Sequence, residues 1–99
     1  MAYTLVILKA AADDTKEAYD YYEEIQTGLG DRFLAEVLVR FNEISHHPQY
    51  YGFIDAQHSI RDVKLKSFPY LVVYEMEDNS VIVYSIHCAY RNPDKRLKK

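Results

Sequence analysis

The sequence predicts an α+β fold in which a helical hairpin packs on one face of a mainly antiparallel four-stranded sheet, in the order β-α-α-β-β-β. Three observations support this fold: an apolar run over residues 3–9, two later stretches with apolar residues at helical spacing, and three β-rich segments after them. The 99 residues are 48% hydrophobic and include only three Gly and three Pro, so we expect one globular domain over residues 1–99.

The first strand is expected over residues 3–9, where apolar residues fall on both parities, as is typical of a strand covered on both faces. The first helix is expected over about residues 15–27. Asp13 or Asp14 would cap its start, and Gly28 would stop its end. The apolar stripe that should face the sheet consists of Ala18, Tyr21, Tyr22 and Ile25.

A second helix is expected after the short turn at residues 28–30, with Asp31 as its cap and its end before Pro48. Its stripe recurs at helical spacing and consists of Phe33, Leu34, Val37, Leu38, Phe41 and Ile44. Because the connecting turn is so short, the two helices should lie antiparallel.

A surface loop is expected over residues 48–58, followed by strands over 59–66, 70–76 and 81–88 and a charged tail over 92–99. Residues 77–80 predict a hairpin turn between the last two strands. Alternation sets one apolar face of the last strand toward the helices, namely Ile82, Tyr84, Ile86 and Cys88. His87 should then point to the open face, where Lys64 and Lys66 are also expected.

Composition excludes several classes of protein. The longest apolar run has five residues, so no membrane span and a cytoplasmic location are expected, and the single Cys88 excludes an intrachain disulfide. Residues 1–57 carry four Lys/Arg against ten Asp/Glu, a balance of −6, whereas residues 58–99 carry eight against five, a balance of +3. The net charge of −3 argues against strong non-specific nucleic-acid binding. The basic second half is either a solvated surface or a surface that meets an acidic partner.

Four segments stand out in order along the chain: EAYDYYEE at 17–24, GLGDRFL at 28–34, the strand from Arg61 through LKSFPY at 65–70, and RNP at 91–93. Together they resemble the RelE/ParE superfamily, in particular the branch of plasmid stabilisation proteins. The resemblance spans nearly the whole chain and implies the toxin of a type II toxin–antitoxin pair, a small bacterial protein that a cognate antitoxin holds inactive.

The resemblance leaves the cellular target open. RelE-like members cleave messenger RNA on the ribosome, ParE-like members inhibit DNA gyrase, and a degenerate toxin would keep antitoxin binding alone. Aligned on RNP, this sequence has Cys88 where many relatives have His, and its own His87 comes one residue earlier. This departure and the acidic net charge favour ParE-like inhibition of a target over RNA cleavage.

Metal-free RNA cleavage needs a base near the 2′-hydroxyl, cations on the phosphate and a proton donor to the leaving oxygen. The residues that could supply these groups are Lys64, Lys66, His87 and Arg91, which form the candidate catalytic set, with Tyr90 beside them as a binding residue. Alternatively, these residues have no catalytic role and are simply polar residues on a solvent-exposed strand face or at a strand end. Arg61, on the opposite parity, binds either a phosphate or a helix carboxylate.

Tyr19 is the third binding candidate, because it lies well off the apolar stripe of its helix and would be free to contact a protein partner. The histidines and the cysteine show neither HExxH nor CxxC spacing, and three glycines make no phosphate-binding loop. Neither a metal nor a cofactor is therefore expected.

Overall fold

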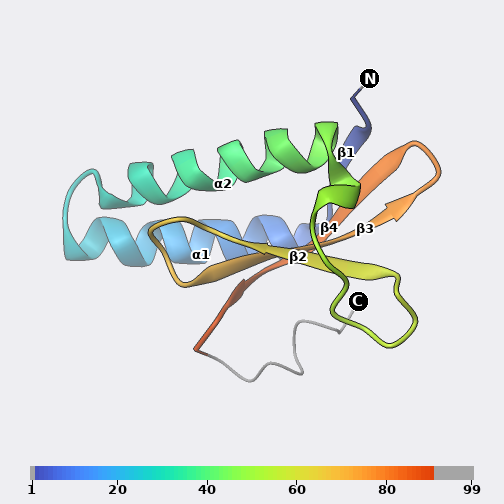
Figure 1. The fold of residues 1–99 in the computed structure, drawn as a ribbon. Helices are drawn as coiled ribbons and strands as arrows, with labels where there is room; N and C mark the ends of the chain where they lie inside the picture. Colours follow the sequence, from blue (N-terminus) through green and yellow to red (C-terminus); the bar gives the residue numbers. More distant parts are fainter. Residues whose placement is uncertain (1, 91–99) are drawn as a thin grey trace.

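The computed structural model of the chain describes residues 2–90. The elements are β1 (Thr4–Ile7), α1 (Lys9–Ile25), α2 (Leu29–His46), the 3-10 helix η1 (Pro48–Tyr50), β2 (Ile60–Lys64), β3 (Tyr70–Glu77) and β4 (Ser80–Cys88). The two long helices pack on a four-stranded sheet of order β1-β4-β3-β2, in which β1 runs parallel to β4 and the other neighbours are antiparallel (Figure 1). The predicted fold class and element order are confirmed.

The first strand is shorter and more exposed than expected. β1 is an edge strand, and Val6 and Ile7 are 38% and 42% exposed, so the prediction of a strand covered on both faces is wrong. The chain turns directly into α1 at Lys9, about six residues before the predicted start. Residues 10–12 are three alanines, the best helix formers, which explains why the helix extends back to the strand.

Carboxylates cap the helices differently from the prediction. Asp13 and Asp14 lie inside α1, and Leu8 precedes the helix without a side-chain cap. Asp31 lies within the first turn of α2. Two backbone N–H groups near the start of α2, those of Gly28 and Gly30, donate to Glu23 Oε1 at 2.9 and 2.8 Å.

The core lies between the helices and one face of the sheet. α2 buries most of its predicted stripe, namely Phe33, Val37, Phe41 and Ile44, in a core cluster shared with residues of β2, β3 and β4. Leu38, which was also placed on that stripe, is 55% exposed. On α1 the buried residues are Ala11 and Ala18, and Tyr22 packs against the core from its edge.

β3 and β4 form the predicted hairpin, which turns at Asp78 in the left-handed region (φ 54°). Its register shifts between Val73 and Tyr74, because Val73 pairs with Ser85 and Tyr74 with Val83, which leaves Tyr84 as the extra residue of a bulge. The bulge reverses the side-chain parity of β4. Its helix-facing residues are therefore Val81 and Val83 before the bulge and Ile86 after it, so the predicted set of Ile82, Tyr84, Ile86 and Cys88 is wrong in its first half.

One carboxylate organises the loop before β2. Asp55 accepts hydrogen bonds from the Ser59 hydroxyl at 2.6 Å and from the backbone N–H groups of Ser59 and Ile60 at 2.8 and 2.9 Å. All three donors favour the charged form, and the Ser59 hydroxyl contributes most, so the pKa of Asp55 is lowered to about 2.

The stability of the fold should therefore decrease as the pH falls from about 4 toward 2. A carboxyl group whose pKa is depressed by folding adds stability above its unfolded pKa of about 3.9, and this contribution is lost as the folded form takes up the proton. Urea midpoints measured from about pH 6 to pH 2 should fall more for the wild type than for Asp55→Asn, so that the two curves converge. Curves that stay parallel would contradict the assignment.

Candidate functional site

Two of the candidate catalytic residues share a row on the sheet face opposite the helices. Lys64 of β2 pairs with Leu71 of β3, and Leu71 pairs with His87 of β4. Because neighbouring strands lie about 4.8 Å apart, the backbones of Lys64 and His87 are roughly 10 Å apart. Lys64 is exposed, as predicted, but His87 is only 9% exposed, so it is not the solvated residue that the alternation suggested.

Lys66 and Tyr90, which belong to the same predicted site, lie outside this row. Lys66 lies beyond the end of β2 and is exposed. Tyr90 is 87% exposed and lines a groove beside α1 instead. Arg91 lies outside the described residues. Among residues 2–90, Lys64 and His87 therefore lie on one face of the sheet, whereas Tyr90 lies at the groove beside α1.

Arg61 of β2 anchors the chain segment that precedes β2 through contacts with its backbone and with one aromatic ring. Its guanidinium donates to the backbone carbonyls of Tyr51 at 2.6 Å and Gln49 at 3.3 Å, and it lies 3.8 Å from the centroid of the Phe53 ring. Neither alternative expected for this residue, a phosphate or a helix carboxylate, is needed to explain its position, because two carbonyls and an aromatic face account for it. Its role in binding a partner stays a prediction.

Tyr19 joins the two helices. Its hydroxyl donates to Asp31 Oδ1 at 2.6 Å, and this hydrogen bond is the main reason why the pKa of Tyr19 is raised to about 12. The contact explains why a tyrosine lies off the apolar stripe of α1 without invoking a partner. A contact between Tyr19 and another protein likewise stays a prediction.

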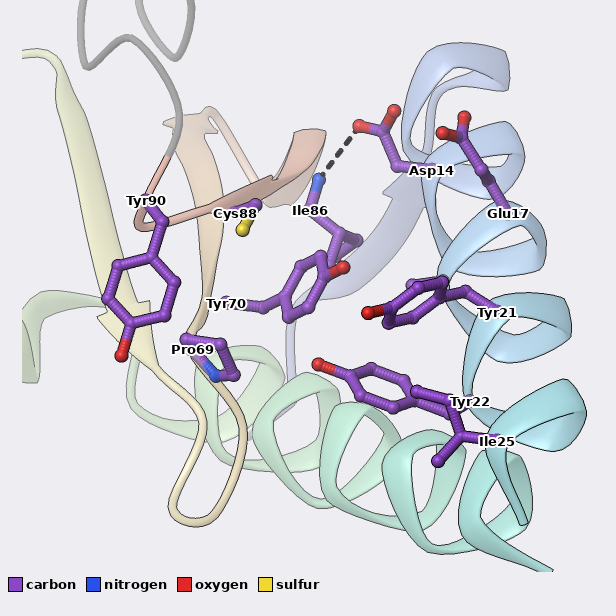
Figure 2. Close-up of a pocket in the computed structure, with 11 residues that line it drawn as sticks. Asp14, Glu17, Tyr21, Tyr22, Ile25, Pro69, Tyr70, Ile86, Cys88 and Tyr90 are labelled. Atoms are coloured by element: carbon purple, nitrogen blue, oxygen red, sulfur yellow. Dashed lines mark hydrogen bonds between the residues drawn. The ribbon is translucent and has the colours of Figure 1, made fainter. Parts of the chain in front are cut away.

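The structure adds a groove that the sequence reasoning missed. It has a volume of about 530 Å³ and lies between α1, the start of β3 and the end of β4 (Figure 2). Its lining residues are Asp14, Glu17, Ala18, Tyr21, Tyr22, Ile25, Pro69, Tyr70, Ile86, Cys88 and Tyr90.

All four residues of the predicted apolar stripe of α1 line the groove, although the sequence predicts that they lie in the core. Ala18 is 4% exposed, whereas Tyr21 and Ile25 are each 57% exposed. Tyr21 and Ile25 therefore form part of the wall of the groove and are not part of the core. Cys88, expected in the core, is half-buried and lines the same groove.

No three His, Cys, Asp or Glu side chains within residues 2–90 gather as a metal site. None of the helices in this part of the chain is long and apolar enough to cross a membrane.

Comparison with known proteins places the chain among toxins. Residues 5–93 match the family model described as the ParE toxin of the type II toxin–antitoxin system parDE. A structure of the chromosomal ParDE system from P. aeruginosa superposes with a TM-score of 0.77 at 16% identity, covering 88% of this chain and 96% of that one. No curated protein sequence matches.

Two structures of the E. coli toxin RelE share the fold at lower TM-scores. An arginine double mutant in the free state gives a TM-score of 0.61 at 19% identity, covering 91% of this chain and 86% of that one. The isolated toxin gives 0.59 at 18% identity, covering 95% and 92%.

Proposed function

Because this chain belongs to the ParE toxin family of type II toxin–antitoxin systems, we propose that it acts by binding and inhibiting a macromolecular target, DNA gyrase, without cutting RNA. The protein is the toxin component of its module, and family membership implies a cognate antitoxin as its partner.

The burial of His87 is the observation that carries this proposal. A general base must reach the 2′-hydroxyl of the RNA while cations hold the phosphate a few ångströms away. In this sheet His87 is 9% exposed, and Lys64, the candidate cation that shares its row among the described residues, lies across Leu71. Binding and blocking a target requires no such convergence.

The alternative is a ribosome-dependent messenger-RNA endonuclease of the RelE kind, using Lys64, Lys66, His87 and Arg91. One observation favours it: Lys64 and His87 do share a face and a row of the sheet. A degenerate toxin that keeps only antitoxin binding is the third candidate.

Two assays on the purified chain and one growth assay in cells separate these functions. We expect it to block DNA supercoiling by gyrase while leaving ribosome-bound messenger RNA intact. Cleaved messenger RNA with unaffected gyrase would establish the endonuclease instead. If both assays are negative and induced expression does not slow growth, the chain is a degenerate toxin.

Replacement of His87 by Gln tests the mode of action at one residue. Gyrase inhibition by His87→Gln should stay within about twofold of the wild type, because the proposal gives the imidazole no proton to transfer. Under the endonuclease alternative, removing the base costs about 100-fold or more in cleavage rate. A thermal melt of the variant serves as the control, since His87 is buried and its replacement also perturbs packing.

A further inference from the structure

The outer side of α2, opposite the core, is apolar at its centre. Between Arg32 and Glu43 the exposed residues of this helix follow one another at helical spacing along that side, and they are Ala35, Leu38, Val39 and Asn42. Leu38 and Val39 are 55% and 58% exposed. Because the core-facing stripe of α2 is buried, this helix carries apolar residues on two opposite sides.

The charged residues within this stretch do not interrupt the apolar centre. Glu36 accepts a hydrogen bond from the backbone N–H of Ser67 at 2.8 Å, and Arg40 donates to the backbone carbonyl of Lys64 at 3.0 Å. Both side chains are thus turned toward the end of β2. A helix at a protein surface ordinarily has charged residues opposite its core side, as α1 has with six Asp/Glu and two Lys. The outer side of α2 is instead typical of a helix that packs against a partner.

Two opposite charges flank the apolar centre at nearly equal distances. Arg32 lies six residues before Leu38, and Glu43 lies four residues after Val39. The midpoint between the charges therefore falls within about one residue, or roughly 1.5 Å, of the midpoint of the apolar pair. The charges are about three helical turns apart, so both lie along the same side of the outer surface. A twofold axis across this centre brings Arg32 of one copy next to Glu43 of the other, and it does so twice.

Glu43 belongs to a small pocket whose chemistry suits a guanidinium group. The pocket has a volume of about 230 Å³ and is lined by Glu43, His47, Tyr50 and Tyr51. One oxygen of Glu43 accepts from Arg40 at 2.9 Å and the other from the Tyr51 hydroxyl at 3.1 Å, but a carboxylate has about four acceptor positions, so two further bonds can form. Tyr50 is 80% exposed, and its ring can stack with a guanidinium.

We propose that a second copy of this chain covers the outer side of α2, with the two α2 helices antiparallel. Leu38 and Val39 of both copies form the centre of the contact, and Arg32 of each copy enters the Glu43 pocket of the other. The charge pattern favours a second copy over an unrelated partner, because the outer side of α2 is complementary to itself under a twofold rotation. α1, with a charge balance of −4, would instead repel its own copy.

The dimer leaves the groove beside α1 open, since no residue of α2 lines that groove. The contact is also small. α2 has 18 residues and is therefore about 27 Å long, and small interfaces are typical of weak association. We expect a dissociation constant on the order of 10 µM.

Sedimentation equilibrium of the purified full chain, from about 1 to 300 µM, tests the dimer. The apparent mass of the wild type should rise from that of a monomer toward that of a dimer. Val39→Asp should weaken association at least about 30-fold, because each new carboxylate lies near its own copy in an apolar contact. The matched control is Ile25→Asp, since Ile25 is also more than half exposed but lies on α1, and it should dimerise like the wild type.

Mixing two charge variants tests the antiparallel arrangement. Arg32→Glu alone and Glu43→Arg alone should each weaken association about 10-fold, because like charges then meet twice. An equimolar mixture of the two should recover nearly the wild-type affinity, since both contacts of the mixed dimer again join opposite charges. Thermal melts verify folding, because Glu43 also binds Arg40 and Tyr51. Val39 makes neither of these contacts, so Val39→Asp remains a test if Glu43→Arg does not fold.

The outcomes separate a second copy from the other possible occupants. A wild type that stays monomeric at every concentration would overturn the inference. A dimer that Ile25→Asp dissolves and Val39→Asp does not would place the contact at the groove beside α1 instead. If the wild type is monomeric and Val39→Asp no longer binds the product of the adjoining reading frame, the antitoxin occupies the outer side of α2. A mixture that recovers no affinity would exclude the antiparallel arrangement.

Discussion

Phe33→Ala should lower the free energy of unfolding by about 3–5 kcal/mol, because it removes a large side chain from a packed site that cannot fully collapse. Phe33 is 0% exposed and contacts three other rings, those of Tyr22, Phe68 and Tyr70, at centroid distances of 5.2 to 5.5 Å. The total free energy of unfolding of a domain is roughly 5–15 kcal/mol, so urea unfolding should show that the variant is much less stable than the wild type.

Leu38→Ala provides the control on the same helix. Leu38 is 55% exposed, so its truncation should cost less than about 1 kcal/mol. Equal losses for the two variants would mean that the aromatic cluster is not the centre of the core.

Gly30→Ala should destabilise the fold by about 1–3 kcal/mol, opposite in sign to the usual effect of Ala in a helix. A Cβ atom at this position would lie 2.6 Å from Glu23 Cγ and 2.7 Å from the backbone oxygen of Tyr19. The contact with Tyr19 is to backbone, so α1 and α2 would have to separate. The Glu23 carboxylate that accepts hydrogen bonds from Gly28 and Gly30 would be displaced as well.

Gly52→Ala is the matched comparison, because a Cβ atom there meets nothing within 4 Å. Its unfolding free energy should be unchanged or raised by about 0.4–1 kcal/mol through the less flexible unfolded chain. If Gly30→Ala were equally harmless, the close approach of the helices would not depend on glycine.

The sequence by itself determined the order of the elements, the packing of both helices on one face of the sheet, and the exposure of Lys64 and Lys66. These features follow from local periodicity, which reports which side of an element is apolar whatever it packs against. The parity of β2 was predicted correctly for the same reason: Val63 and Leu65 are buried, and the two lysines are exposed. Family resemblance added the toxin assignment.

Only the tertiary structure decided which carboxylates act as caps, which face of β4 points inward, and which residues of the apolar stripes are buried. Glu23 caps the start of α2 from the neighbouring helix, a contact that no spacing rule within α2 could predict. The bulge at Tyr84 depends on pairing between two strands, and it changed the inward face of β4. The neighbouring elements leave Tyr21 and Ile25 more than half exposed, so the same apolar residues that predicted a core form a wall of an open groove.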